Sequence, residues 1–246
     1  MLIALITDIH GNNLAFEACL VQAASLGAAR MVFLGDLVGY GAEPETAVRQ
    51  VMELAMQGAV VLKGNHDNAV NVPGETMNTY AQCAIEWTRS QLGGEAKSFI
   101  AGLALQLRED DRLYVHADAS SPRRWRYVTD ADAARVSLSA TDARITFCGH
   151  VHAPALYCLS ETGKLTSHRP VSNVGIALTE QRRWLAVIGS AGQPRDGNPA
   201  AAYATYDTAT RLLTFRRAPY DAEAAAAKIR AAGLPDMLAA RLLVGR

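Results

Sequence analysis

Seven side chains able to bind a metal ion follow short apolar runs along this chain of 246 residues. In sequence order they are Asp8, His10, Asp36, Asn65, His116, His150 and His152. Mixed carboxylate, imidazole and amide ligands suit Mn²⁺, Fe or Zn²⁺ better than Mg²⁺ or Cu⁺. The residue types therefore point to a metal site, provided that the fold brings them together.

Each of these residues has a simpler explanation when it is taken alone. The sequence DIH at residues 8–10 is more often a turn or a helix cap, and a Gly-Asn pair favours a left-handed turn. An isolated His116 is more often a partly buried histidine with an ordinary hydrogen-bond partner. Five separate turns, each placed directly after an apolar run, explain the whole series poorly.

The first part of the chain alternates apolar runs with amphipathic segments. Residues 1–7, 30–36 and 59–67 are predicted to be strands, and residues 13–27 and 43–58 have helical spacing. Such alternation indicates a parallel sheet with helices on its faces. In sheets of this kind ligands bind beyond the carboxyl ends of the strands, which is where the first four candidate ligands lie.

Later in the chain, residues from about 76 to 102 are expected to be mostly helical, and residues 221–233 carry a strong helix signal. Further predicted strands are 112–118, 143–154, 155–160, 183–192, 201–207 and 211–218. There is no linker, repeat or low-complexity segment apart from the alanine run near residue 225. One α/β domain over residues 1–246 is the expected organisation.

Five short motifs, taken together and in order, resemble the calcineurin-like metallophosphoesterase superfamily. They are DIHGN, GDLVGYG, GNHD, VHA and CGHVH, and the resemblance covers roughly residues 3–154. A looser similarity, carried by LGDLVGYG and GSAGQPRDGNPAAAYATYD, is to bacterial relatives of diadenosine tetraphosphatases and small phosphodiesterases. The resemblance implies a four-layer α-β-β-α sandwich of two mixed sheets, with a dinuclear metal site at the carboxyl ends of strands.

The resemblance also implies how two divalent cations are bound. Asp8, His10, Asp36 and His152 would bind the first, and Asp36, Asn65, His116 and His150 the second. The Asp36 carboxylate would bridge the ions, which would then lie ~3.5–4 Å apart and contact one phosphoryl group together. Mn²⁺ is the favoured ion, and Fe, Zn²⁺ and Ni²⁺ are alternatives.

The reaction implied is hydrolysis of a phosphodiester or a small nucleotide by a hydroxide that bridges the two cations. His66 would protonate the leaving oxygen or stabilise the transition state, and Asp67 would orient the His66 ring. A purely structural hydrogen bond is the alternative for His66. The rival functions are a phosphomonoesterase or phosphoprotein phosphatase at the same site, a non-catalytic binding scaffold and a nuclease.

Substrate contacts are less well indicated. Asn12 could touch a phosphate oxygen, and Arg195 could present its planar fork to a phosphate or lie in a surface turn. Tyr40 could line the pocket or be an ordinary loop residue. The RRWRY segment, which contains Arg123 and Arg126, suits either a nucleotide or a solvated loop anchored by a tryptophan. The segment HADASSP is longer here than in many relatives, so the substrates of those relatives cannot be assigned to this protein.

Composition narrows the class of protein. Lys and Arg number 24, Asp and Glu number 24, and there is no dense basic run, which argues against nucleic acid as a partner. The four cysteines form no C-x-x-C pair and are expected to be reduced thiols in the core. With no signal peptide or apolar membrane span in view, a cytoplasmic protein without a membrane partner is expected. The sequence gives no prediction of the oligomeric state.

Overall fold

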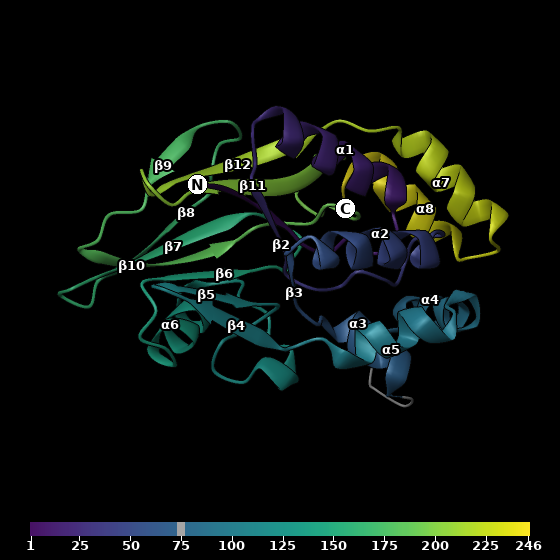
Figure 1. Ribbon diagram of the computed structural model, residues 1–246, viewed down its shortest axis with the longest axis horizontal. Coiled ribbons are helices and arrows are strands. Elements are labelled where there is room, and N and C mark those ends of the chain that lie inside the picture. Colours follow the sequence, from purple (N-terminus) through teal and green to yellow (C-terminus); the bar gives the residue numbers. More distant parts are fainter. Residues whose placement is uncertain (73–76) are drawn as a thin grey trace.

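The computed structural model describes residues 1–72 and 77–246. Two six-stranded sheets lie face to face, and helices cover the outer face of each sheet (Figure 1). This arrangement confirms the expected four-layer α-β-β-α sandwich. The assignment of residues 1–246 to one domain stays a prediction.

The first sheet contains the parallel strands expected near the N-terminus, extended by antiparallel strands from the second half of the chain. In spatial order its strands are β3 (Val60–Val61), β2 (Arg30–Phe33), β1 (Leu2–Ile6), β11 (Ala201–Asp207), β12 (Leu212–Ala218) and β9 (Gly175–Ala177). β1, β2 and β3 are parallel, so their carboxyl ends open at the same edge.

The second sheet also has a parallel centre, formed by its second, third and fourth strands. In spatial order its strands are β4 (Gln106–Glu109), β5 (Arg112–Val115), β6 (Ile145–Cys148), β10 (Arg182–Val187), β7 (Ala155–Ser160) and β8 (Leu165–His168). β4 and β7 pair antiparallel with this centre, and β8 pairs antiparallel with β7.

The apolar run of β1 is explained by burial on both faces. Successive strand residues point to opposite faces, so Ile3 and Leu5 join the core between the two sheets, and Ala4 and Ile6 face the outer helices. A strand covered on both sides reads as a continuous apolar run rather than an alternating one. The same pairing places the loop after Ile6 deep in the molecule.

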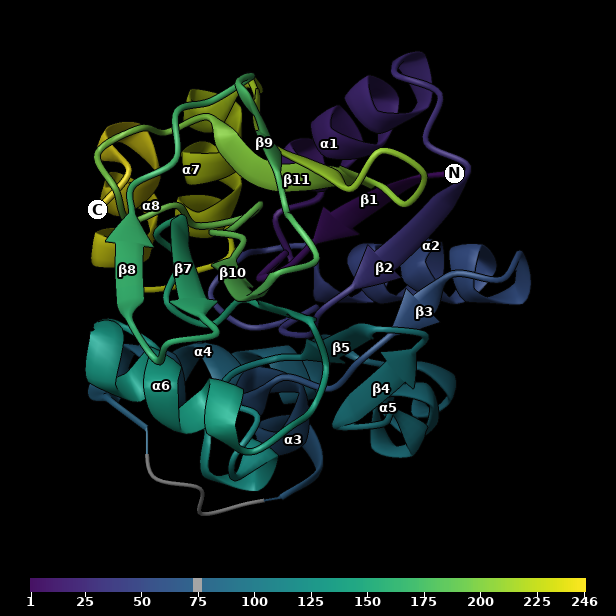
Figure 2. The ribbon, with the colours of Figure 1, turned by 90° about the vertical axis from the view of Figure 1, so that its left-hand side faces the viewer.

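Helices α1 (Asn13–Ser25) and α2 (Pro44–Met56) pack on the outer face of the first sheet, and α6 (Ala131–Ser139) packs on the outer face of the second. Figure 2 shows α1 and α6 on opposite sides of the two sheets. Pro122–Arg124 form a short 3₁₀ turn before α6. These helices close the two outer layers of the sandwich.

The remaining helices gather at the end of the molecule away from the N-terminus (Figure 1). They are α3 (Asn65–Asn71), α4 (Thr79–Gln91), α5 (Gly94–Gly102), α7 (Ala222–Ala231) and α8 (Asp236–Val244). Apolar side chains of α4, α7 and α8 form a cluster of their own, which also includes Tyr40. This cluster fixes the C-terminal helices against the loop that follows β2.

Several expected elements differ from the observed ones. The predicted strand 59–67 is reduced to β3, because Asn65 already begins α3. The helical stretch predicted at about 76–102 is two helices, α4 and α5, separated near Gly93, and residue 76 lies outside the described residues. Strands β4, β8 and β9 and helices α6 and α8 were not anticipated; β8 and β9, being largely exposed, lack an apolar pattern.

The cysteines and helices bear on two further expectations. Cys19, Cys148 and Cys158 are free and buried as expected, whereas Cys83 is free and exposed on α4. Among the described residues, no helix is both long and apolar enough to cross a membrane.

The core between the sheets should be sensitive to truncation at Phe147. Its ring is fully buried, stacks on Tyr114 at 5.7 Å and meets Tyr206 at 5.5 Å. We expect Phe147→Ala to lower the free energy of unfolding by about 3–5 kcal/mol, measured by urea denaturation. The control Val21→Ala, at a side chain 71% exposed, should change it by less than about 0.5 kcal/mol. Equal effects in both variants would contradict this packing.

Candidate metal centre

Loops after the parallel strands of both sheets meet at one end of the sandwich. β1, β2 and β3 lead to Asp8, Asp36 and Asn65, while β5 and β6 lead to His116 and His150. Ligand atoms of two groups lie within 4.8 Å of one another: Asp8, His10, Asp36 and His152 form one, and Asp36, His116 and His150 the other. Asn65 joins the second group, because its Oδ1 lies 3.2 Å from His116 Nε2.

Asp36 is common to both groups. Its Oδ2 lies 3.6 Å from His10 Nε2 and 3.5 Å from His116 Nε2. Its Oδ1 accepts a hydrogen bond of 2.8 Å from the backbone N–H of His66, which fixes the carboxylate. Asp36 is therefore the geometric link between the groups.

The first group brings hydrogen-bond acceptors together without donors. His10 Nδ1 faces the Val38 carbonyl at 3.1 Å, and His152 Nδ1 faces the Gln193 carbonyl at 2.7 Å. If each ring carries its proton on Nδ1 and donates it to the carbonyl, both Nε2 atoms present lone pairs, and these two atoms are only 3.0 Å apart. Asp8 Oδ1 lies 3.1 Å from His152 Nε2 and, in the described part of the chain, has no hydrogen-bond donor.

The second group repeats this arrangement. His116 Nδ1 lies 2.9 Å from the Leu34 carbonyl, and His150 Nε2 lies 2.9 Å from the Trp125 carbonyl. The remaining ring nitrogens, His116 Nε2 and His150 Nδ1, are 3.2 Å apart. A backbone carbonyl at the far nitrogen of each ring is the usual arrangement around metal-binding histidines.

These donor sets fit two divalent cations. Acceptors that face one another in a buried site are costly unless a proton or a cation lies between them. All seven side chains are buried except that of Asn65, which is half-buried. Oxygen and imidazole nitrogen are suitable ligands for the ions considered above.

The electrostatics of the site show the same demand for positive charge. Burial opposes ionisation of Asp36, yet His116, His66 and His10 hold the pKa of its carboxyl well below its usual range. Burial also disfavours a charged His116, but Asp36 and Asp8 raise the pKa of His116 to about 9. The paired carboxylates thus draw positive charge into the site.

The backbone at the site is strained. Asp8, His10, Asp36, His150 and His152 all have positive φ values, between 51° and 66°. Left-handed backbone at a residue other than glycine costs roughly 1–3 kcal/mol and is typical of functional sites. These turns let side chains two residues apart in the sequence reach the same small volume.

Two glycines permit the close approach of the loops. A Cβ at Gly64 would overlap Asp36 Oδ1, and a Cβ at Gly149 would overlap Thr7 Oγ1 and Asp8 Oδ2. Glycine is therefore required before Asn65 and His150 because a larger residue would clash with the neighbouring loop.

His66 and Asp67 lie beside Asp36, but they do not form the expected pair. Asp67 accepts hydrogen bonds from the backbone N–H groups of Leu37 at 2.9 Å, Val38 at 3.3 Å and Gly64 at 2.9 Å. Both carboxylate oxygens are thus used to join the loops after β2 and β3. His66 Nδ1 is buried and has no hydrogen-bond partner among the described residues. Asp67 therefore positions loops rather than the His66 ring.

The side chain of Asn12 makes several hydrogen bonds within the fold. Its Oδ1 accepts from Ala15 N–H at 3.2 Å, and its Nδ2 donates to the Gly192 carbonyl at 2.8 Å and to Tyr220 at 3.2 Å. These contacts cap α1 and leave the side chain committed to the fold. A contact between Asn12 and a substrate phosphate stays a prediction.

Arg195 and Tyr40 lie at the edge of the site. The backbone N–H of Arg195 donates to the His152 carbonyl at 3.0 Å, and its guanidinium carbon is 5.7 Å from the centre of the Tyr40 ring. The Tyr40 ring lies 4.6 Å from the ring of His10 and 4.5 Å from that of His66. Both residues are therefore close enough to contact a bound molecule.

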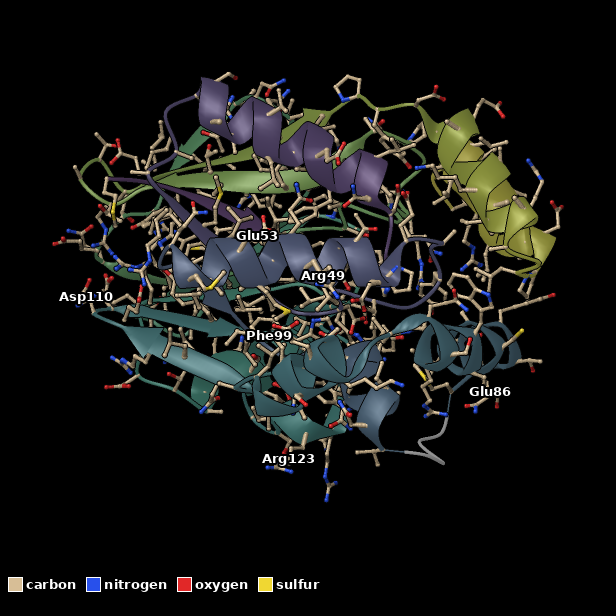
Figure 3. The ribbon with its side chains drawn as sticks, turned by 45° about the vertical axis from the view of Figure 1, so that its right-hand side comes forward. Arg49, Glu53, Glu86, Phe99, Asp110 and Arg123 are labelled. Atoms are coloured by element: carbon tan, nitrogen blue, oxygen red, sulfur yellow. The ribbon has the colours of Figure 1, made fainter. Side chains whose placement is uncertain are left out.

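The RRWRY segment contributes to the site through residues other than its arginines. The Trp125 carbonyl accepts from His150, and the Tyr127 ring stacks on His150 at 4.1 Å while remaining 54% exposed. Arg123 extends outward at the surface of the molecule (Figure 3), and Arg126 is also exposed. No sequence pattern indicates Tyr127, nor Gln193 and Arg241, which lie beside Arg195.

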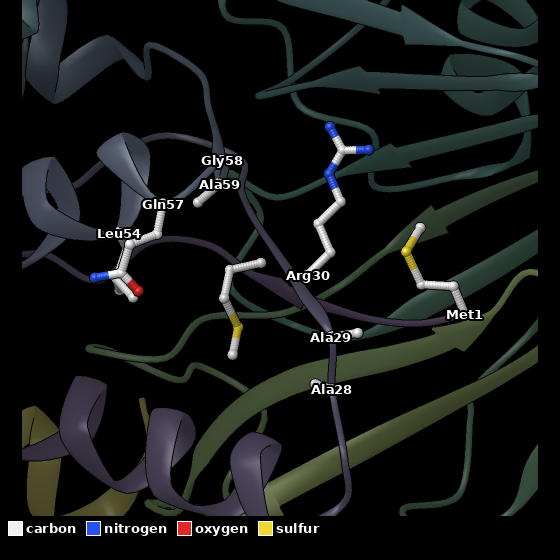
Figure 4. Close-up of a pocket in the computed structure, with 9 residues that line it drawn as sticks. Met1, Ala28, Ala29, Arg30, Leu54, Gln57, Gly58 and Ala59 are labelled. Carbon is white, nitrogen blue, oxygen red and sulfur yellow. The ribbon is translucent and has the colours of Figure 1, made fainter.

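A hollow of about 410 Å³ lies at the opposite end of the first sheet (Figure 4). It is lined by Met1, Arg30 and Gln57 among others, and Arg30 is already paired with Glu109. Its lining residues offer no cluster of metal ligands or nucleophiles. The chemically competent site is therefore the one at the carboxyl ends of the strands.

Comparison with known proteins identifies the family. The calcineurin-like phosphoesterase superfamily domain matches residues 1–211. An uncharacterized protein of Methanocaldococcus jannaschii is 34% identical over 251 residues, covering 100% of this chain and 98% of that protein. The crystal structure of a metallophosphoesterase from Sphaerobacter thermophilus superposes with a TM-score of 0.88 at 33% identity, covering 100% of both chains.

A hypothetical protein from Pyrococcus horikoshii OT3 has the same fold, with a TM-score of 0.80 at 16% identity over 100% of this chain and 98% of that one. The family match and the two relatives above 30% identity agree with the geometry of the site. The chain belongs to the calcineurin-like phosphoesterase superfamily and is a phosphoric ester hydrolase.

Proposed function

We propose that the protein hydrolyses a phosphodiester or a small nucleotide at a centre that binds two divalent cations. The observation that carries this proposal is the convergence of two buried groups of hydrogen-bond acceptors that share Asp36. Mn²⁺ is the proposed ion, and Fe, Zn²⁺ and Ni²⁺ are the alternatives to be tested.

The proposed ligands of the first cation are Asp8, His10, Asp36 and His152, and those of the second are Asp36, Asn65, His116 and His150. Two bound divalent cations supply Lewis-acid stabilisation of a phosphoryl group and lower the pKa of water from ~15.7 to near 7. The backbone carbonyls of Val38, Leu34 and Gln193 hold ring protons of His10, His116 and His152 on the far nitrogens, leaving the inner nitrogens free to coordinate.

His66 is proposed to act on the leaving group as a hydrogen-bond donor. Its Nδ1 packs towards Gly39 without an acceptor among the described residues, which favours the tautomer with the proton on Nε2. Burial lowers the pKa of His66 to about 4, so the ring is neutral and keeps a single N–H. Arg195 is proposed to contact a substrate phosphate.

The proposal is tested with chelator-treated protein and two chromogenic esters. Bis-nitrophenyl phosphate should be hydrolysed only after Mn²⁺ is added back, and faster than nitrophenyl phosphate if diesters are preferred. The reverse preference would assign the centre to a phosphomonoesterase. Absence of turnover with Mn²⁺, Fe²⁺, Zn²⁺ and Ni²⁺, despite two bound ions, would support a binding scaffold.

Replacement of Asp36 should remove metal and activity together, because this carboxylate lies at both groups. We expect Asp36→Ala to lower metal affinity and turnover by ~100-fold or more. Even the loss of a group that only hydrogen-bonds to a metal ligand typically lowers metal affinity or activity by about 10–100-fold. Elemental analysis and the bis-nitrophenyl phosphate assay measure the two losses. The control is Asp132→Ala, at an exposed carboxylate on α6. A fully active and fully metallated Asp36→Ala protein would refute the assignment.

Gly149→Ala should weaken metal binding although it replaces none of the proposed ligands. The added methyl group would displace Thr7 and Asp8, so we expect affinity for Mn²⁺ to fall by about 10–100-fold. Calorimetric titration of the metal-free protein measures this, independently of catalysis. Gly102→Ala is the matched control, because a Cβ there would meet nothing within 4 Å. Wild-type affinity in Gly149→Ala would show that the close approach of these loops is unimportant.

A further inference from the structure

Two arginines from distant parts of the chain meet at one buried glutamine beside the candidate metal centre. Arg195 donates to Gln193 Oε1 through Nη2 at 2.7 Å and Nε at 3.2 Å. Arg241, on α8, donates to the same oxygen through Nη1 at 3.4 Å. Gln193 is 1% exposed, so a single neutral oxygen holds both cationic groups at the edge of the protein interior.

The charge of this pair is not balanced by a carboxylate. No salt bridge within the described residues involves either arginine, and the adjacent carboxylate of Asp196 is paired with Arg217 instead. Arg241 Nε is buried and, in the same part of the chain, has no acceptor. Burial, followed by the charge of Arg195, holds the pKa of Arg241 below its usual value. The arrangement therefore has both unused donors and uncompensated positive charge.

The pair is separated from the candidate metal centre by one aromatic ring. The guanidinium carbon of Arg195 lies 5.7 Å from the centre of the Tyr40 ring. The rings of His10 and His66 also pack against Tyr40. The backbone of Arg195 is joined directly to His152. A molecule bound at the metal centre could therefore reach the arginines without leaving the site.

We propose that Arg195 and Arg241 form a subsite for a second phosphate group of the substrate, distinct from the phosphoryl group that is attacked. The inference rests on the proposed function and narrows its substrate class to esters or anhydrides with at least two phosphate groups, as in polyphosphorylated nucleotides. Guanidinium groups bind phosphate oxygens through paired N–H donors, and such charge-assisted bonds are stronger than the present bonds to a neutral amide.

The position of Arg241 assigns this subsite to the C-terminal helices. Residues 212–246 lie beyond the part of the chain that matches the family, which ends at residue 211. On α8, Leu238 and Leu242 are buried in the cluster that contains Tyr40, and Arg241 lies on the same side of the helix. The C-terminal helices thus contribute one of the two arginines of the subsite.

The test compares nucleotides that differ by one phosphate group. Adenosine 5′-monophosphate, adenosine 5′-diphosphate and adenosine 3′,5′-bisphosphate are used as inhibitors of bis-nitrophenyl phosphate hydrolysis and as ligands in calorimetry. In the wild type, at least one of the two bisphosphorylated nucleotides should bind about 10-fold or more tightly than the monophosphate. In Arg241→Gln that advantage should largely disappear.

Two further variants keep the test decisive. Arg241→Lys, which retains the charge but not the planar fork, should keep part of the advantage and covers the case in which Arg241→Gln does not fold. Arg246→Gln removes one positive charge at an exposed residue and should keep the full binding advantage of the nucleotides with two phosphate groups. Equal binding of the three nucleotides in the wild type, or an advantage that survives in Arg241→Gln, would overturn the subsite.

Failure of the proposed function would appear differently. Absence of hydrolysis with every metal tested would refute the hydrolase while calorimetry still measured the difference between the nucleotides. Turnover with no such difference would leave the hydrolase in place and refute only the subsite.

Discussion

The convergence of lone pairs on two small buried volumes is the constraint on which the rest of the structure depends. Imidazole nitrogens from His10 and His152 stand 3.0 Å apart, and those from His116 and His150 stand 3.2 Å apart, with Asp36 reaching both pairs. Such an arrangement is unfavourable unless positive charge is present. The fold therefore holds together buried acceptors that call for a cation.

Holding them requires a rigid frame. Five ligand residues have left-handed backbone, and glycines allow the loops to approach within contact of the carboxylates. The two sheets supply the rigidity: each delivers ligands from the carboxyl ends of buried parallel strands, and the core between the sheets fixes their relative position. Asp67 strengthens the frame by joining the loops after β2 and β3. Burial on both faces of β1 thus has a direct consequence for the chemistry.

Side chains at the edge of the candidate site come from two regions of the chain. The candidate ligands, Tyr40 and Arg195 lie within residues 1–211, which match the family domain, whereas Arg241 lies on α8. Tyr40 connects the two regions, since it contacts His10 and His66 and also packs with the C-terminal helices.

The parallel β-α-β units and the set of candidate ligands could be predicted from the sequence, because apolar runs and the polar residues that end them are local patterns. The proximity of all seven candidates could be predicted only through the family resemblance, and the structure brings all seven side chains close together. The contacts of Asn12 and Asp67 were not predictable, because each side chain had several possible partners and the packed loops selected among them. Arg241 carries no local signal at all, because its proximity to Arg195 depends on the packing of α8 against Tyr40, which lies about 200 residues earlier in the chain.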